Sequence, residues 1–179
     1  REHLGAHVTQ KGSMVAEDRL RFDFSHPKAV TADEIARIEA DVNAQVRGND
    51  AVTTRLMNPD DAVAAGALAL FGAKYGAEVR VLTMGKSEDT HYSLELCGGT
   101  HVNALGDIAL FTIISEGAVA SGIRRIEALT GEAARLWLVG RETQLKNVAA
   151  MLKTAPDEVS VRIETLMNER KRMEKELSE

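Results

Sequence analysis

The sequence of 179 residues contains a single cysteine, Cys97, three prolines and no long apolar run. One cysteine excludes an internal disulfide framework. No segment has the pattern of a signal peptide or a membrane-spanning helix. These absences favour a cytoplasmic protein, in which Cys97 would remain a reduced thiol able to bind a metal. Internal repeats and low-complexity tracts are also absent.

The charge balance is mildly acidic, with 22 Lys and Arg against 27 Asp and Glu and a net charge of −5. This argues against a dedicated electrostatic nucleic-acid binder, although a catalytic domain whose RNA affinity resides elsewhere is compatible with it. A hydrophobic content of 44% is enough for a packed core. The first residue is Arg1 and not methionine, so we expect a fragment of a longer protein that lacks an upstream part.

The first 130 residues mix strand and helix patterns without a regular alternation. A capping box at Thr31 to Glu34 predicts a helix that ends at Gly48, and Asn58-Pro59 predicts a second helix through Ala69. Strand patterns occupy residues 13–16, 20–24, 51–57, 79–83, 92–96, 107–115 and 123–129. The order predicts an α+β domain with a mainly antiparallel sheet and packed helices.

Residues 131–179 have a different character, because helical propensity continues without a strand signal. We expect a helix over 132–152, a break at Pro156, and a second helix capped by Asp157. Apolar residues in this second helix follow a 4-3 spacing interrupted by Arg170: Val159, Ile163, Leu166, Met173 and Leu177. This predicts a helical hairpin or the start of a coiled coil able to self-associate, with an ordinary amphipathic helix as the alternative. The predicted domains are therefore 1–130 and 131–179.

The segment LELCGGTHV carries the most informative local chemistry, since Cys97 is followed four positions later by His101. Thiolate and imidazole are typical zinc ligands. The intervening glycines make a helix unfavourable and predict a tight loop after a strand. The alternative is a buried thiol beside an unrelated loop histidine. An H-x-x-x-H pair, His3 and His7, would complete a four-ligand set, although histidines near a terminus more often face solvent.

Two other polar segments are candidate ligand loops. Residues 7–13 (HVTQKGS) offer an amide, an ammonium and a hydroxyl, which suits either hydrogen bonding to a small ligand or a solvated turn. Residues 117–122 (GAVASG) precede Arg124 and Arg125, which suits a backbone loop near an anion or a flexible turn. We expect His26 and His91 to lie at the surface.

Taken together, several segments resemble the editing domain of alanyl-tRNA synthetases in the correct order: HVTQKGSMV, RLRFDFSH, LFGAKYGAEVRVLTMG, LELCGGTHV and GDIALFTIISEGAVASGIRRIEALTG. The heptad pattern that follows is similar to the start of that family's C-terminal coiled-coil region. The resemblance covers essentially the whole chain, and CGGTHV followed by SGIRRIEALTG is its most specific part.

The resemblance implies an α+β fold and a zinc site built from an H-x-x-x-H pair and the C-x-x-x-H pair. Cys97 and His101 match the second pair. His3 and His7 match the letters of the first pair but align with a later segment of the family. The remaining two Zn2+ ligands are therefore expected upstream of Arg1, and whether His3 or His7 replaces them stays open.

The implied activity is hydrolysis of the ester that joins serine or glycine to the tRNA for alanine. The resemblance implies that this activity belongs to a larger parent protein, an alanine–tRNA ligase that binds ATP. The resemblance assigns Gln10 and Ser13 to the catalytic pocket. Gly98, Gly99, Thr100 and Arg124 would contact the substrate or the tRNA end. Because neighbouring side chains of a strand point to opposite faces, Arg125 should not share the role of Arg124.

Two alternatives remain at this stage. A free-standing trans-editing protein would catalyse the same hydrolysis without long terminal heptads. A zinc-stabilised, non-catalytic scaffold would use the terminal helix for association, and the acidic charge fits it equally well.

Overall fold

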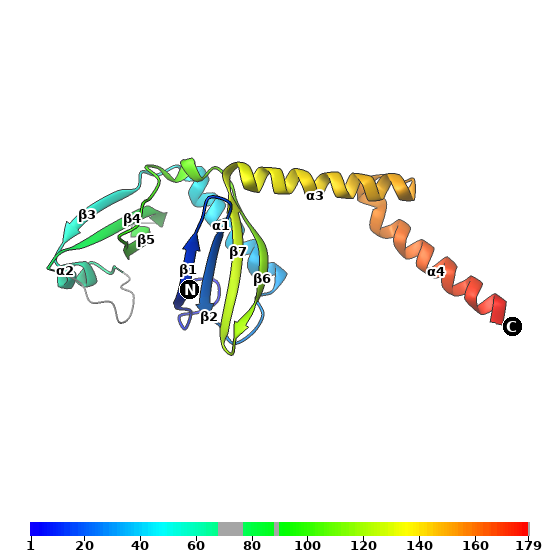
Figure 1. Ribbon diagram of the computed structural model, residues 1–179, viewed down its shortest axis with the longest axis horizontal. Coiled ribbons are helices and arrows are strands. Elements are labelled where there is room, and N and C mark those ends of the chain that lie inside the picture. The colour runs from blue at the N-terminus through cyan, green and yellow to red at the C-terminus, as the bar shows by residue number, and fades with distance from the viewer. Residues whose placement is uncertain (68–76, 88–89, 179) are drawn as a thin grey trace. The chain divides into compact units, whose positions relative to one another are not determined.

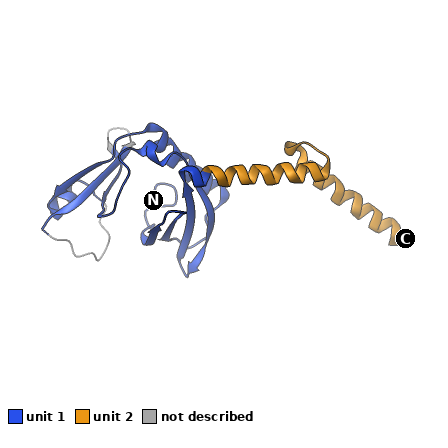
Figure 2. Cartoon of the chain, turned by 45° about the horizontal axis from the view of Figure 1, so that its top comes forward, with its two compact units in different colours: residues 1–134 blue, residues 135–179 orange. Residues whose placement is uncertain are grey.

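The computed structural model describes residues 1–67, 77–87 and 90–178. The chain divides into two compact units, residues 1–134 and 135–179, which Figure 2 distinguishes by colour. The first unit contains two antiparallel sheets, and the second is helical. The predicted α+β class is confirmed, with two separate sheets where one mainly antiparallel sheet was expected. The assignment of residues 1–130 to an editing domain stays a prediction.

A four-stranded sheet has the strand order β1-β2-β7-β6. Its strands are β1 (Gln10–Val15), β2 (Leu20–Ser25), β6 (Phe111–Ala120) and β7 (Ile123–Thr130). In β2, Phe22 and Phe24 share one face because side chains alternate along a strand, and they pack with Val8 and Val30. Residues 7–13 were predicted to form a polar loop, but strand β1 begins within this segment, at Gln10. Residues 117–122 were also predicted to form a loop, but strand β6 continues as far as Ala120.

Helix α1 (Ala32–Gly48) begins and ends as the sequence predicts. The Thr31 hydroxyl accepts the Glu34 backbone N–H at 3.2 Å, and the Glu34 carboxylate accepts the Thr31 N–H at 2.8 Å. Asn49 closes the helix in a left-handed conformation with a φ of 52°. The Asn43 side chain exchanges two hydrogen bonds with the backbone of Phe111 at 2.8 and 2.9 Å, so α1 is anchored to the edge strand β6.

The three-stranded sheet has the order β3-β4-β5. Its strands are β3 (Thr53–Met57), β4 (Val79–Ser87) and β5 (Thr90–Leu96). Helix α2 (Pro59–Ala64) opens with the predicted Asn58 cap, whose side chain accepts the Asp60 N–H at 2.9 Å. It packs Ala62 against Val79, Val81 and Leu96 in a hydrophobic cluster separate from that of the first sheet.

Two predicted elements have wrong boundaries. Helix α2 ends at Ala64 instead of Ala69, because Gly66 adopts a φ of 87° and the Ala67 N–H donates to the Ala62 carbonyl, as in a Schellman ending. Residues 68 and 69 lie outside the described residues. The strand predicted over 107–115 is a 3-10 turn, η1 (Leu105–Ile108), before β6 begins. The Asp107 carboxylate accepts the Ala104 N–H at 3.1 Å and stabilises this turn.

The last two helices are α3 (Gly131–Leu152) and α4 (Val159–Ser178), as Figure 1 shows. A Schellman ending closes α3, since Lys153 has a φ of 52° and the Thr154 N–H donates to the Ala149 carbonyl. Pro156 starts a 3-10 turn, η2 (Pro156–Glu158), so Asp157 lies within that turn and not at a helix cap. Ile163, Met173 and Leu177 of α4 are exposed in the single chain.

Candidate active site

A cleft of about 1160 Å³ lies within the first unit. Its wall includes Gln10 and Ser13 from β1, Phe22 from β2, Tyr92 from β5 and Cys97 just beyond β5. Both sheets thus contribute apolar and polar side chains to a single concave surface. Such a cleft is the ordinary form of a small-ligand site.

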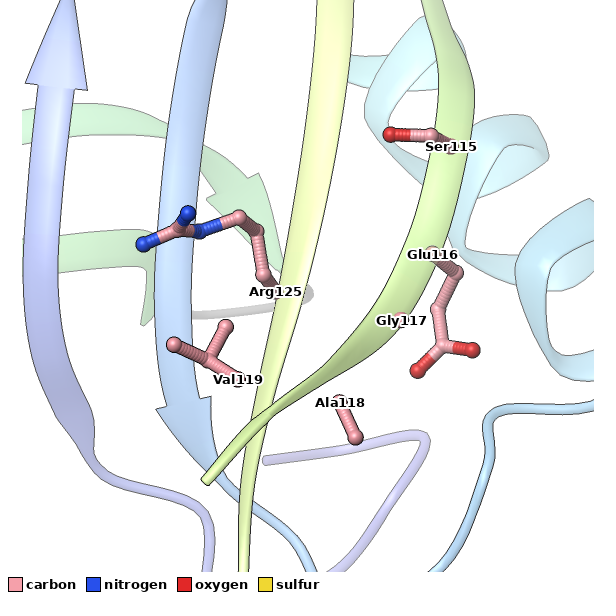
Figure 3. A pocket seen from close by; sticks show the side chains of 6 residues that line it. All are labelled: Ser115, Glu116, Gly117, Ala118, Val119 and Arg125. Carbon is pink, nitrogen blue, oxygen red and sulfur yellow. The ribbon is translucent and has the colours of Figure 1, made fainter.

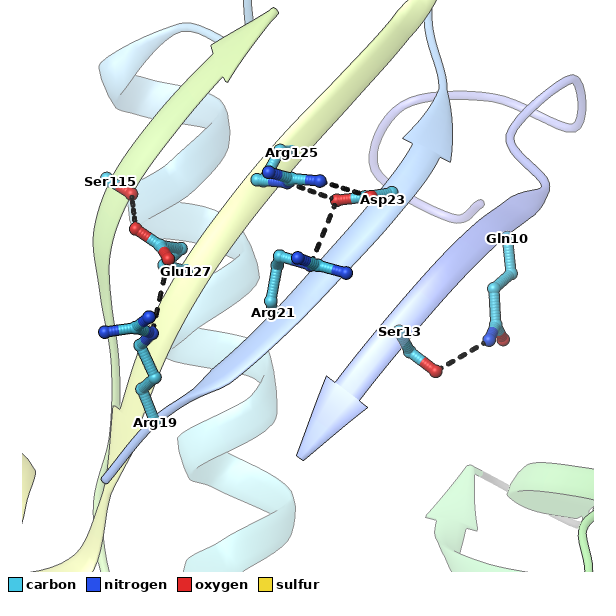
Figure 4. A network of polar contacts seen from close by, with 8 residues as sticks. All are labelled: Gln10, Ser13, Arg19, Arg21, Asp23, Ser115, Arg125 and Glu127. Carbon is cyan, nitrogen blue, oxygen red and sulfur yellow. Dashed lines mark hydrogen bonds and ion pairs between the residues drawn. The ribbon is translucent and has the colours of Figure 1, made fainter. Parts of the chain in front are cut away.

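Gln10 and Ser13 interact directly on the β1 wall of the cleft. The Gln10 amide nitrogen donates to the Ser13 hydroxyl at 2.9 Å (Figure 4). A register shift between Gln10 and Gly12 in the pairing of β1 with β2 accompanies this arrangement. The two side chains predicted to line the pocket therefore share one polar patch, and their catalytic role remains a prediction.

Cys97 and His101 are close together in the loop after β5. The Cys97 Sγ lies 3.2 Å from the His101 Nε2. Two ligands of a tetrahedral zinc ion would lie ~3.6 Å apart at ordinary Zn–S and Zn–N lengths, so a small opening of the pair would admit the ion. A Cβ on Gly99 would lie 3.6 Å from the sulfur and 3.7 Å from the Nε2. The glycine therefore leaves the space beside the pair open.

Burial, followed by the positive charge of Arg80, lowers the pKa of His101 below its ordinary value, and Glu95 opposes the shift. A lowered pKa keeps the imidazole neutral near pH 7, which is the form that binds a metal. Donor chemistry, spacing and protonation state all fit two ligands of a zinc site. Gly98, Gly99 and Thr100 are exposed and follow Cys97 at the edge of the cleft without lining it.

The N-terminal histidines have other partners. His3 Nε2 lies 3.0 Å from an Asp41 oxygen, and this oxygen also accepts the Tyr92 hydroxyl at 3.0 Å. His7 Nε2 lies 2.9 Å from His26 Nδ1, and the two rings are stacked. Within the described ranges, the one three-residue group able to hold a metal is Glu2, His3 and Asp41. Neither histidine therefore joins Cys97 and His101 in a metal-ligand group.

Of the two histidines predicted to lie at the surface, one is exposed and the other is buried. His91 is exposed, as expected. His26 is 3% exposed, so its predicted surface position is wrong. It contacts His7 and packs against Phe24, which lies two residues earlier on β2.

Arg124 and Arg125 lie on opposite faces of β7, as strand alternation predicts. Arg124 makes a bidentate ion pair with Glu116 at 2.5 and 2.6 Å, and both side chains are mostly buried. In Figure 3 Glu116 points away from Arg125, which lines a second pocket of about 410 Å³ with Ser115 and Val119. Neither arginine lines the larger cleft. The structure thus places Arg124 in a salt bridge, separate from Gln10 and Cys97.

A polar network covers the outer face of the four-stranded sheet (Figure 4). Arg125 donates to both Asp23 oxygens at 2.7 and 2.8 Å, and Arg21 lies 3.9 Å from the same carboxylate. Arg19 and Ser115 both approach Glu127. The hydrogen bond from Arg125 is the main cause that lowers the pKa of Asp23.

Comparison with known proteins identifies the family. Residues 79–127 match the family described as the second additional domain of threonyl and alanyl tRNA synthetases. The whole chain is 72% identical over 179 residues to an alanine–tRNA ligase of Sphingopyxis alaskensis, covering 20% of that protein. It is 67% identical over 183 residues to the enzyme of Rhizorhabdus wittichii, covering 21% of it. The chain is thus similar over its whole length to one segment of alanine–tRNA ligases.

The chain spans about a fifth of the length of the curated relatives that it matches. The matched residues 79–127 contain β4, β5, the Cys97–His101 pair and the Arg124–Glu116 ion pair. The predicted resemblance is therefore confirmed at the level of the family. No helix within the described residues is long and apolar enough to cross a membrane.

Sequence reasoning missed several polar residues around the cleft. Asp41 and Tyr92 form the contact that links α1 to β5, and neither belongs to a local motif. The carboxylate partners of Arg124 and Arg125 were also missed. The alternating pattern RFDF could have indicated that Asp23 lies on the polar face of its strand. Glu116 lies eight residues before Arg124, across the β6–β7 hairpin, and hairpin register was the signal that could have found it.

Proposed function

We propose that this chain is the editing module of a cytoplasmic alanine–tRNA ligase. In this role it hydrolyses the ester that joins serine or glycine to the tRNA for alanine. The observation that carries the proposal is the cleft that is lined by both the Gln10–Ser13 pair and Cys97. The match of the whole chain to alanine–tRNA ligases supports a role in the ligase over that of a free-standing protein.

A second site is physically necessary for accurate aminoacylation of this tRNA. A pocket built for alanine discriminates weakly against glycine, which is smaller, and against serine, which adds one hydroxyl. Binding alone separates such near-isosteres by on the order of 10²-fold or less. An editing site must therefore recognise the serine hydroxyl itself and leave alanine esters intact.

Gln10 and Ser13 supply the polar groups for that recognition. Their mutual hydrogen bond leaves the Gln10 carbonyl and the Ser13 hydroxyl proton available to the hydroxyl of a bound seryl group. Both side chains are exposed in the free chain. Once the bound tRNA end covers them, an alanyl group would leave these atoms unpaired, at about 1–3 kcal/mol for each polar group then buried. Gly98, Gly99 and Thr100 would let the tRNA end approach beside Cys97.

Cys97 and His101 would hold Zn2+, and the other ligands would come from a part of the longer protein outside these residues. The bound ion would supply positive charge that either activates a water molecule or anchors the aminoacyl group. In the reaction, a water oxygen bonds to the ester carbonyl carbon and the bond to the ribose oxygen breaks. The ribose oxygen takes up a proton, and free serine leaves.

Arg124 would contact the tRNA end from a fixed position. Its bidentate bond to Glu116 uses Nε and Nη2, so Nη1 is left outside that pair. A guanidinium held in this way loses little rotamer freedom when it binds RNA.

We also propose that α4 supports self-association, because its seam residues Ile163, Met173 and Leu177 are 41%, 52% and 88% exposed. Sedimentation of the chain with and without a charged substitution at Ile163 tests this second point.

Deacylation of seryl- against alanyl-tRNA for alanine, with the longer protein that contains this chain as the enzyme, tests the proposed activity. We expect faster loss of serine than of alanine. Gln10→Ala should reduce the preference for serine by roughly 10-fold, the equivalent of one lost hydrogen bond. Gln144→Ala, on the exposed surface of α3, is the matched control and should leave the preference unchanged.

Three results would contradict parts of the proposal. Equal rates for both esters would contradict recognition of the serine hydroxyl. Unchanged selectivity in Gln10→Ala would remove this residue from the pocket. A folded, zinc-loaded chain with no turnover would favour the non-catalytic scaffold.

A further inference from the structure

Arg80 lies next to the Cys97–His101 pair but belongs to no site described above. It is in β4, and its carbonyl accepts the Cys97 backbone N–H at 3.2 Å, immediately beyond the Val81–Leu96 pairing of β4 with β5. Figure 1 shows these two strands side by side. Its side chain is partly buried.

The guanidinium of Arg80 differs from those of β7. Arg124 and Arg125 each bind a carboxylate with two nitrogens. Arg21 of β2 also has a buried Nε without a hydrogen-bond acceptor, but it lies 3.9 Å from the Asp23 carboxylate. Within the described residues, Arg80 has no carboxylate partner, and its Nε is buried without a hydrogen-bond acceptor. Glu95 is on the neighbouring strand, but it pairs with Leu82 in register and accepts the Ser93 hydroxyl at 3.1 Å.

A partly buried cation without an acceptor is unfavourable, because it has lost water without gaining a replacement. The cost is removed when an anion binds. A planar guanidinium with five donors matches the oxygens of a phosphate particularly well. The aminoacyl group carries a positive ammonium, so it is not the part of the substrate that this charge attracts.

The position of Arg80 distinguishes between the anions that a charged tRNA offers. Arg80 does not line the cleft that contains Gln10 and Ser13, whereas Cys97 does. The part of a bound tRNA nearest Arg80 is therefore the chain that leads to the cleft, and not the ester held within the cleft. Backbone phosphates of the terminal nucleotides are anions of this kind.

We propose that Arg80 binds a backbone phosphate of the single-stranded 3′ end of the tRNA and so positions the ester beside Cys97. This inference rests on the proposed editing function. It adds a nucleic-acid contact in the three-stranded sheet, in a protein whose net charge of −5 provides little general attraction for RNA.

The test measures the affinity of the full chain for a short RNA hairpin with the single-stranded 3′ end of the tRNA, over a series of salt concentrations. Arg80→Gln should raise Kd roughly tenfold and reduce the magnitude of the salt slope by about 0.7, the value for one lost phosphate contact on a single strand. Arg80→Lys keeps the charge and should keep the slope. Arg55→Gln, an exposed arginine on the adjacent strand β3, should change neither quantity.

Seryl-tRNA hydrolysis gives the second readout, in which Arg80→Gln should raise KM and leave kcat nearly unchanged. Unchanged Kd and slope in Arg80→Gln would overturn the inference, as would a fall in kcat alone, which would place the guanidinium at the reacting carbonyl. If Arg80→Gln does not fold, the Arg80→Lys variant is the test. A smaller salt slope of RNA binding in Arg80→Lys would also overturn the inference. RNA binding that depends on Arg80 without any hydrolysis would contradict the editing function and leave the phosphate contact standing.

Discussion

The two sheets of the first unit handle charge in opposite ways. In the four-stranded sheet, the arginines of β7 are each neutralised by a carboxylate of a neighbouring strand, Arg124 by Glu116 and Arg125 by Asp23. In the three-stranded sheet, Arg80 has no such partner within the described residues and lies beside Cys97 and His101. Paired charges stabilise a fold, whereas an unpaired charge beside a reactive pair is available to a ligand. The difference indicates that the paired arginines of β7 stabilise the first sheet, whereas Arg80 is the cation that we propose for a ligand contact in the second.

The largest expected effect compares the hydrophobic clusters of the two sheets. Phe24→Ala removes a side chain that is 4% exposed, and it should lower the free energy of unfolding by about 3–5 kcal/mol. Val81→Ala, at 2% exposed, removes fewer atoms and should cost about 2 kcal/mol. Urea unfolding measures both values. A larger loss in Val81→Ala would contradict the expectation that the cost rises with the number of buried atoms removed.

A smaller effect is expected on the pH dependence of stability. Hydrogen bonds from Arg124 lower the pKa of Glu116 below its ordinary value, and those from Arg125 do the same for Asp23. A carboxylate whose pKa is lower in the folded state stabilises the fold above its unfolded pKa, and this contribution is lost as the pH falls through the folded value. We expect stability to decrease below about pH 4.

Urea titrations between pH 7 and pH 3 measure this acid limb. The double variant Asp23→Asn and Glu116→Gln should be less stable at pH 7 and should have a flatter acid limb. Glu95→Gln, an exposed acid of the three-stranded sheet, is the matched control and should keep the original pH dependence. An unchanged acid limb in the double variant would show that these ion pairs contribute nothing to the fold.

The smallest expected effect concerns the cap of α1, the helix that contacts strands of both sheets. Thr31→Ala removes the cap and should lower the free energy of unfolding by about 1 kcal/mol. Thr165→Ala, in the middle of the exposed helix α4, should have little effect. Equal losses in the two variants would mean that the capping box does not stabilise α1.

The elements that the sequence predicted well are those encoded by neighbouring residues. The Thr31–Glu34 box, the Asn58-Pro59 start and the period-2 pattern of β2 all act within a few residues, so sequence and structure agree there. The early end of α2 was also encoded locally, but Gly66 was not recognised as a stop. The strand expected at 107–115 begins only at Phe111, because an Asp107 side chain and a backbone turn at Ala109 outweigh β-propensity before it.

The site was predictable only in its local parts. The four-residue spacing of Cys97 and His101 predicted a pair, and the structure brings the two atoms within 3.2 Å. The period-2 series Phe22, Phe24 and His26 is a local signal for the burial of His26, and the contact with His7 comes from a more distant segment. The isolation of Arg80 is visible only once the partners of the other arginines are known.

The most direct test of the central claim is Cys97→Ala, with seryl-tRNA deacylation and thermal unfolding measured on the same preparation. If Cys97 belongs to an editing site, hydrolysis should fall by at least about 100-fold while circular dichroism and Tm remain close to those of the original chain. If Tm collapses and the chain unfolds, the thiol has a structural role and the scaffold is favoured. Full hydrolysis in a folded variant would contradict a catalytic Cys97–His101 pair outright.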